Sequence, residues 1–207
     1  MPYQFLPEWP GAVEPSLRML DGDVQKVTVI DPTPDEFGFA FDFGPPSRTG
    51  RHVDPKHVPT ALTFSARKGM KIPDVDLIHG GFFCVSERMK GLIEGLEPGV
   101  HQFLPMTYRW KDGSVAEERW LFVCGNRVRA LNGKKTTLKK AKKPGKYMAS
   151  RVGNIVFDSA NIGDRQFWVC SDMLGDYTFM SDRAFNLFVD ADVTGLKLSD
   201  EQYHSAA

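Results

Sequence analysis

The middle of the chain carries the clearest pattern of apolar and polar positions, and it predicts a strand followed by a helix. Gly81–Val85 has only glycine and apolar residues, which predicts a buried strand. Ser86 then fits a helix N-cap, and Glu87 is favourably placed in the first turn. Helical spacing continues in the apolar positions that follow, which are Met89, Leu92, Ile93 and Leu96. Pro98-Gly99 predicts the end of this helix.

A hairpin and three further strands are predicted after this helix. Phe103–Trp110 and Arg119–Cys124 are rich in strand-forming residues, and they flank Lys111-Asp112-Gly113-Ser114. An Asp-Gly pair between two such runs is a strong hairpin signal. The further strand candidates are Arg127–Leu131, Asn154–Phe157 and Gln166–Cys170.

The end of the chain echoes its middle. Thr178-Phe179-Met180-Ser181-Asp182-Arg183 parallels Phe83-Cys84-Val85-Ser86-Glu87-Arg88 at an offset of 95 residues. In both segments an apolar strand leads to a serine, an acidic residue and an arginine, and a helical pattern follows. The sequence therefore predicts two related strand–cap–helix units, at residues 83–97 and 178–191, in an α+β fold with a mostly antiparallel sheet.

Proline shapes the first part of the chain, because eleven of the 14 prolines lie in residues 1–73. Proline is poorly tolerated inside helices, so this region predicts short strands, among them Val24–Ile30, and ordered loops. Four phenylalanines alternate with other residues over Phe37–Phe43, which places their rings on one face, either in the core or as a binding surface. We expect a Pro-rich, mainly β and loop region at residues 1–73 and an α+β region at residues 74–207, or one compact unit formed by both.

The composition is that of an ordinary soluble globular protein. The 207 residues are 42% hydrophobic and 25% charged, which excludes a disordered chain, a coiled coil and a disulfide scaffold. No apolar run approaches the ~18 residues of a membrane span, and the first ten residues do not resemble a signal peptide. Cys84, Cys124 and Cys170 lie far apart in apolar runs, which predicts reduced core thiols and a cytoplasmic protein.

The net charge of zero conceals a strongly basic stretch. Residues 134–146 carry seven lysines and no acid, and the rest of the chain sums to −7. This balance argues against a generally basic nucleic-acid-binding protein, although one local basic patch could hold phosphate or an acidic partner. This lysine stretch contains no interleaved aromatic residue before Tyr147, so it does not predict a stacking platform for single strands. A flexible solubilising loop is the other interpretation.

Several catalytic patterns are incomplete in this sequence. Ser86 and Ser181 lie at strand-to-helix turns, where a hydrolase nucleophile would lie, but the flanking glycines of that turn are missing. Capping is therefore their favoured role. Gly133-Lys134-Lys135-Thr136 departs from a phosphate-binding loop, because Lys135 replaces the hydroxyl residue that should follow the first lysine. Asp190 and Asp192 are interpreted as surface charges. No catalytic residue is predicted, and the chain is not expected to be an enzyme.

The histidines offer one weak metal candidate. His52, Asp54 and His57 place two imidazoles and a carboxylate within six residues, a set that a borderline metal could use. The spacing suggests no further ligand, so a solvated loop is favoured, and no metal or cofactor is predicted. His79 and His101 stand singly beside apolar runs, and a hydrogen-bonded structural role is expected for each.

A set of segments from residue 72 onward carries a family resemblance. They are Ile72-Pro73-Asp74, Phe83-Cys84-Val85-Ser86-Glu87-Arg88-Met89-Lys90, Leu92-Ile93-Glu94, Glu97-Pro98-Gly99, His101-Gln102-Phe103-Leu104-Pro105, Met180-Ser181-Asp182-Arg183 and Val193-Thr194-Gly195-Leu196. With them the chain resembles a bacterial immunity-protein family that protects against polymorphic toxins, the family numbered eleven and formerly a domain of unknown function. Residues 1–71 match it only loosely, and the lysine stretch is not part of the resemblance.

The resemblance implies an inhibitor that binds its cognate toxin domain in the cytoplasm, rather than an enzyme. Toxins that act on nucleic acids carry basic clefts, so an acidic inhibitor face would steer their association. We therefore expect partner contacts in the variable N-terminal region, with the lysine stretch as the competing site. The expected contact residues are Asp35, Glu36, Phe37 and Asp42. The alternatives are a small hydrolytic enzyme that uses the His52–His57 loop and a nucleic-acid-associated module that uses the lysine stretch.

Overall fold

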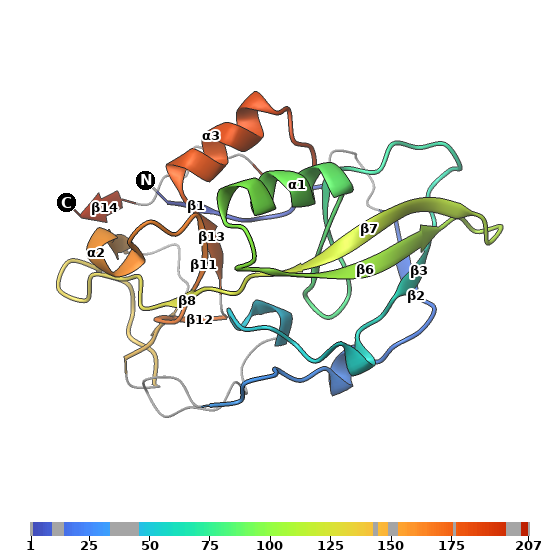
Figure 1. Ribbon diagram of the computed structural model, residues 1–207. Coiled ribbons are helices and arrows are strands. Elements are labelled where there is room, and N and C mark those ends of the chain that lie inside the picture. Colours follow the sequence, from blue (N-terminus) through green and yellow to red (C-terminus); the bar gives the residue numbers. More distant parts are fainter. Residues whose placement is uncertain are drawn as a thin grey trace.

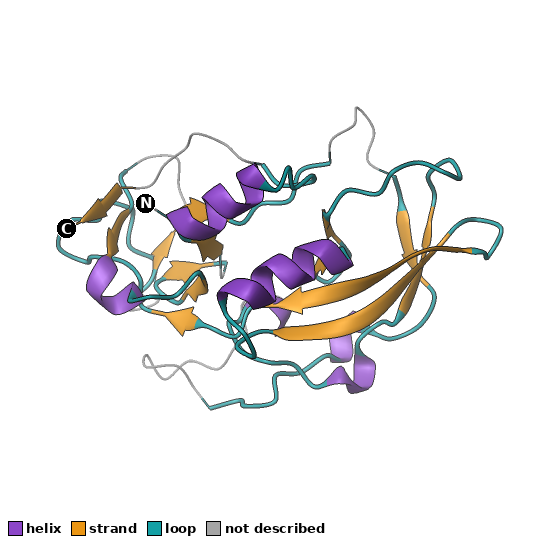
Figure 2. Ribbon diagram, turned by 45° about the horizontal axis from the view of Figure 1, so that its top comes forward, coloured by secondary structure: helices purple, strands orange, loops and turns teal. Residues whose placement is uncertain are grey.

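A computed structural model describes residues 2–9, 15–33, 46–142, 145–148, 153–175, 177–197 and 204–206. In these ranges the two longest helices, α1 (Glu87–Leu96) and α3 (Asp182–Asp190), lie next to each other on one side of the β-sheets (Figure 1). A long hairpin runs beneath α1 and extends beyond it (Figure 2). None of the helices in these ranges is long and apolar enough to cross a membrane.

The larger sheet has six strands in the order β2-β3-β6-β7-β5-β4. Their bounds are Leu17–Met19 (β2), Ala61–Phe64 (β3), Val75–Leu77 (β4), Phe83–Val85 (β5), Gln102–Arg109 (β6) and Val115–Val123 (β7). All neighbours are antiparallel except β3 and β6. The predicted hairpin is confirmed as β6–β7, and Gly113 takes a positive φ of 83° in its turn.

The second sheet has four strands in the order β1-β13-β11-β8, with β8 parallel to β11 and the other pairs antiparallel. Their bounds are Tyr3–Gln4 (β1), Arg127–Val128 (β8), Phe167–Cys170 (β11) and Thr178–Met180 (β13). Two small parallel pairs join β9 (Tyr147–Met148) to β12 (Met173–Leu174) and β10 (Val156–Asp158) to β14 (His204–Ala206). The predicted α+β class with mostly antiparallel pairing is confirmed.

Serines are the N-cap residues of both long helices. The Ser86 Oγ accepts a hydrogen bond from the Met89 backbone N–H at 3.1 Å, and the Ser181 Oγ accepts one from the Ala184 N–H at 3.1 Å. β5 leads into the first cap and β13 into the second. That these two segments form an internal repeat stays a prediction. The short helix α2 (Ser159–Ile162) begins at Asp158 in the same manner.

The N-terminal region departs from the sequence prediction at Val24–Ile30, which is not a strand. The Asp23 carboxylate accepts a hydrogen bond from the Gln25 N–H at 3.1 Å and starts the 3₁₀ helix η1 (Val24–Lys26). A capping side chain of this kind offers the backbone an alternative to a sheet ladder. Only an isolated bridge remains, from Val29 to Val53. Two further 3₁₀ helices are η2 (Pro46–Arg48) and η3 (Pro55–His57).

Three buried apolar clusters hold the sheets and helices together. The central cluster lies where α1 and α3 meet both sheets, and it includes Met89, Phe122, Phe167 and Phe188. Alternate residues of the strands face the two outer clusters, with Leu121 and Val123 on one side and Trp168 and Cys170 on the other. The central cluster therefore contains residues of both sheets.

A buried polar link reinforces the junction of the sheets. The Glu97 carboxylate at the end of α1 accepts hydrogen bonds from the His101 imidazole at 2.9 Å, the Asn126 side chain at 3.1 Å and the Phe167 N–H at 2.9 Å. The other His101 ring nitrogen accepts from the Gly125 N–H at 3.1 Å. The expected structural role of His101 is confirmed, since both of its nitrogens bind groups of the fold.

Cys84, Cys124 and Cys170 are free and buried, as predicted, with one in each apolar cluster. Burial raises the pKa of the Cys84 thiol to about 11 and the pKa of each of the other two to about 12. These thiols are therefore protonated at neutral pH and act as small apolar side chains.

Candidate functional site

The four expected partner-contact residues, Asp35, Glu36, Phe37 and Asp42, lie outside the described residues. The alternating phenylalanines of Phe37–Phe43 lie there as well. Their assignment to the toxin interface stays a prediction. Two charged clusters in the described ranges are the remaining candidates: a partly buried polar network at the start of α1, and a basic surface around the lysine stretch.

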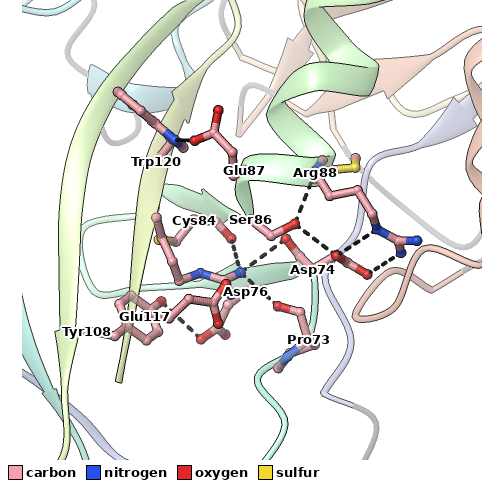
Figure 3. A network of polar contacts seen from close by, with 12 residues as sticks. Pro73, Asp74, Asp76, Cys84, Ser86, Glu87, Arg88, Tyr108, Glu117 and Trp120 are labelled. Atoms are coloured by element: carbon pink, nitrogen blue, oxygen red, sulfur yellow. Dashed lines mark hydrogen bonds and ion pairs between the residues drawn. The ribbon is translucent and has the colours of Figure 1, made fainter. Parts of the chain in front are cut away.

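Asp74, just before β4, is the centre of the polar network (Figure 3). Its carboxylate accepts hydrogen bonds from the Ser86 hydroxyl at 2.8 Å, from the Arg88 guanidinium at 2.8 Å, and from both the N–H and the hydroxyl of Thr194 at 3.0 and 2.9 Å. Burial alone would raise the pKa of this carboxyl, but the hydrogen bonds outweigh burial and lower the pKa to about 2. Asp74 is therefore ionised at neutral pH and ties α1 to the segment after α3.

Arg119 on β7 forms the second half of this network, which we call the Asp74–Arg119 network. The residue is 1% exposed. One guanidinium nitrogen, Nη2, donates to the backbone carbonyls of Pro73 at 2.7 Å, Asp74 at 3.1 Å and Cys84 at 3.3 Å. Its Nη1 lies 3.1 Å from the Glu117 carboxylate. The fork of arginine lets Nη2 contact the carbonyls while Nη1 contacts the carboxylate.

The network contains residue types found in active sites, but their environment favours structure over catalysis. The Ser86 hydroxyl donates to Asp74 and accepts from the Met89 N–H, and none of its partners among the described residues is an imidazole. The Cys84 thiol is buried, with its pKa raised to about 11. Burial also raises the pKa of Tyr108 well above its usual value, and its hydroxyl lies 3.2 Å from Asp76. Such groups lack the access and activation that a nucleophile needs.

Segments that carry the family resemblance meet in this network. Asp74, Ser86 and Arg88 come from two of them, and Thr194 comes from a third that lies 120 residues after Asp74. Gly195 follows with φ of +86°, and a Cβ there would lie 2.1 Å from the Val75 carbonyl oxygen, so only glycine fits. These motif residues therefore hold β4, α1 and the C-terminal segment together.

The His52–His57 loop shows no assembled metal site. The His52 Nε2 lies 3.0 Å from the Val100 carbonyl oxygen, and the Asp54 carboxylate accepts from the Lys56 N–H at 2.9 Å to begin η3. Within the described ranges, no group of three or more histidines, cysteines and acids is placed to hold a metal ion. The hydrogen bonds of His52 and Asp54 favour a role in ordering this loop.

The start of the lysine stretch also has a structural turn rather than a phosphate-binding loop. The Asn132 side-chain oxygen accepts hydrogen bonds from the backbone N–H groups of Lys134 at 3.1 Å and Lys135 at 3.2 Å. The Thr136 hydroxyl donates to the Val156 carbonyl at 3.0 Å. The backbone N–H groups that would have to bind a phosphate are thus directed at a side chain of the protein itself.

The basic surface is hollowed by two adjacent pockets beside β8. The first, which we call the lysine pocket, has a volume of about 220 Å³, and the second, the arginine pocket, about 380 Å³. The described residues that line the lysine pocket are Arg129, Leu131, Gly133, Lys140, Ala141, Gly145, Lys146, Tyr147 and Asp172. Those that line the arginine pocket are Arg127, Val128, Arg129, Leu131, Asn161 and Arg165.

Several side chains that line the pockets are held by hydrogen bonds within the fold. The Lys146 ammonium donates to the Ser171 carbonyl, and Lys146 is buried. One Arg127 nitrogen donates to the Thr49 carbonyl at 2.8 Å. The buried Asp172 carboxylate accepts from the Leu131 N–H at 2.9 Å and lies 3.5 Å from Arg129. The arrangement offers positioned cations to a bound anion.

Sequence reasoning found the lysine stretch but missed the arginines that complete this surface. Arg127 and Arg129 flank the buried Val128, so a period of two was available as a signal. Arg165 gave no comparable signal, because it reaches the arginine pocket only through the fold.

Comparison with known proteins supplies the family. A family model described as Immunity protein family (Imm11) matches residues 25–202. The match covers most of the chain, including the Asp74–Arg119 network and both pockets, and it starts well before residue 72, where the sequence resemblance begins. No curated protein matches the chain.

Proposed function

This chain belongs to the Imm11 immunity protein family, and on that premise we propose that it binds a cognate toxin domain in the bacterial cytoplasm and neutralises it. The family match is the observation that carries the proposal. Neutralisation would follow from binding alone, by covering the toxin's active site or holding the toxin in an inactive state. No metal, cofactor or catalytic step is required of this chain.

The side-chain environments support an inhibitor over the hydrolase alternative. The Ser86 hydroxyl is engaged in capping, the Cys84 thiol is protonated in the core, and His52 is engaged with a backbone carbonyl. A hydrolase needs a nucleophile within reach of a base and of its substrate. The groups at these three positions therefore have structural roles.

The toxin contact includes, in this proposal, the acidic segment with Asp35, Glu36, Phe37 and Asp42. Residues 1–50 hold eight acids and three bases, so this part of the chain would attract a basic cleft. Long-range attraction of this kind raises the association rate more than it slows dissociation. Neutralising Asp35, Glu36 and Asp42 together should therefore slow toxin binding at low salt.

Co-expression tests the function directly. A candidate toxin domain, taken from the genes that adjoin the one for this chain, is induced with the chain, and with an empty vector as control. Cells should survive only when the chain is present. Death in both cultures, with the chain soluble and no complex on purification, would overturn the proposal.

A titration separates an inhibitor from an enzyme that destroys the toxin or repairs its damage. Purified chain is added stepwise to active toxin, and residual toxin activity is measured. An inhibitor should reach full protection near one equivalent and should release intact toxin on denaturation. Protection at a small fraction of an equivalent would point to catalysis. Chelator should leave both protection and melting temperature unchanged.

A further inference from the structure

The lysine and arginine pockets concentrate positive charge on a chain that is otherwise acidic. Five of their described lining residues are cations, and one is an acid, so the lining favours an anion. They are Arg127, Arg129, Lys140, Lys146 and Arg165, with Asp172 as the acid. We propose that the two pockets bind an acidic segment of the toxin, with one carboxylate entering each pocket. This inference rests on the proposed function and adds a second contact to it.

Three of these cations are accessible to a partner. Lys140 and Arg165 are exposed, and the Arg129 side chain is 56% exposed although it lies 3.5 Å from Asp172. Arg129 lines both pockets. Its guanidinium can therefore bridge two carboxylates, and the planar fork of arginine suits this geometry.

Two of the lining cations are hydrogen-bonded within the fold before a partner arrives. Lys146 is 6% exposed and donates to the Ser171 carbonyl, and Arg127 donates to the Thr49 carbonyl. Binding a carboxylate over such anchored cations orders fewer flexible side chains than binding over free surface lysines, so less conformational entropy is lost. Concave shape and anchored charge distinguish this surface from a merely solubilising loop.

An acidic protein segment fits this surface better than a nucleic acid does. Tyr147, the one aromatic among the described lining residues, is 8% exposed, so its ring offers no platform on which bases could stack. Outside residues 134–146 the chain sums to −7. That charge would repel a long polyanion but would disfavour a short acidic segment much less.

Binding of a labelled polyglutamate peptide tests the surface without the toxin. The triple variant Arg129→Ala, Lys140→Ala and Arg165→Ala removes the accessible cations. The matched control replaces three exposed cations elsewhere, Arg18, Lys71 and Lys111, with alanine. By fluorescence anisotropy at low salt, the first variant should bind the peptide roughly tenfold more weakly, and the control should bind like the wild type. Equal binding by the first variant and the wild type, or equal loss in both variants, would overturn the inference.

Two further measurements separate the outcomes. An oligonucleotide of equal charge competes in the same assay. Tighter binding of the oligonucleotide through these three residues would indicate that the partner is a nucleic acid and not a protein.

In co-expression, the triple variant should protect less well than the control variant while melting at the same temperature. If wild type protects and the triple variant protects equally, the proposed function stands and this surface is not part of it. If wild type fails to protect, the proposed function itself is wrong.

Discussion

Arg119 and Arg129 carry the same group in opposite surroundings. Arg119 is 1% exposed, and its guanidinium is enclosed by three backbone carbonyls and a carboxylate. The Arg129 side chain is 56% exposed and lines two pockets. A buried charge must be satisfied within the protein, whereas an exposed charge stays available to a partner. Burial and hydrogen-bond partners, rather than residue type, distinguish the arginine of the Asp74–Arg119 network from the arginine of the two pockets.

The largest effect should come from removing the buried charge. Arg119→Met keeps an unbranched side chain but leaves Glu117 and the surrounding carbonyls without their donor. We expect a loss of about 3 kcal/mol in the free energy of unfolding, because breaking a buried ionic contact leaves polar groups uncompensated. Denaturant unfolding measures it. Arg129→Met is the matched control, and a similar loss in both variants would erase the distinction between the two arginines.

Acid should weaken the buried network through Asp74. Hydrogen bonds lower the pKa of this carboxyl to about 2 in the folded protein, below the ~3.9 of an unfolded aspartate. Its stabilisation is therefore complete above about pH 5 and disappears as the pH falls through about 2. The stability difference between wild type and Asp74→Asn should shrink by up to about 2 kcal/mol over this window. Parallel pH profiles of the two proteins would contradict the assignment.

The cap whose serine has a charged partner should contribute more to stability than the cap whose serine has a neutral partner. The Ser86 hydroxyl donates to the Asp74 carboxylate, whereas the Ser181 hydroxyl donates to the neutral side chain of Gln166. A hydrogen bond to a charged group is the stronger of the two. We expect Ser86→Ala to cost about 2 kcal/mol and Ser181→Ala about 1 kcal/mol. Thermal unfolding of both variants compares them directly, and an equal cost would show that capping alone matters.

Local signals predicted much of the fold. The Asp-Gly hairpin, the serine caps and the apolar strands were visible because turns and caps depend on a few neighbouring residues. The same local logic failed at Val24–Ile30, where Asp23 starts a 3₁₀ turn that the apolar pattern did not reveal.

The lysine stretch was visible in the sequence, but which charged residues from distant segments meet in the fold could not be predicted from it. Asp74 meets Thr194 across 120 residues of chain, and Arg165 joins Arg127 and Arg129 only because α2 packs beside β8. The sequence also offered no reason to expect that Arg119, between two glutamates and a tryptophan on β7, would be buried. Long-range contacts decide which charges are enclosed, and single-sequence patterns do not report them.

The smallest expected change in stability is at the accessible arginine. Arg129→Ala removes a largely exposed side chain whose Nε lies 3.5 Å from the Asp172 Oδ1. Exposed ion pairs contribute little to stability, so the free energy of unfolding should change by less than about 1 kcal/mol. Its effect should appear instead in the rate of toxin association, which should fall at low salt and converge with the wild type as salt screens the charge. Stopped-flow binding at several salt concentrations measures this. A rate that matches the wild type at low salt, with the fold intact, would place the toxin contact on another surface.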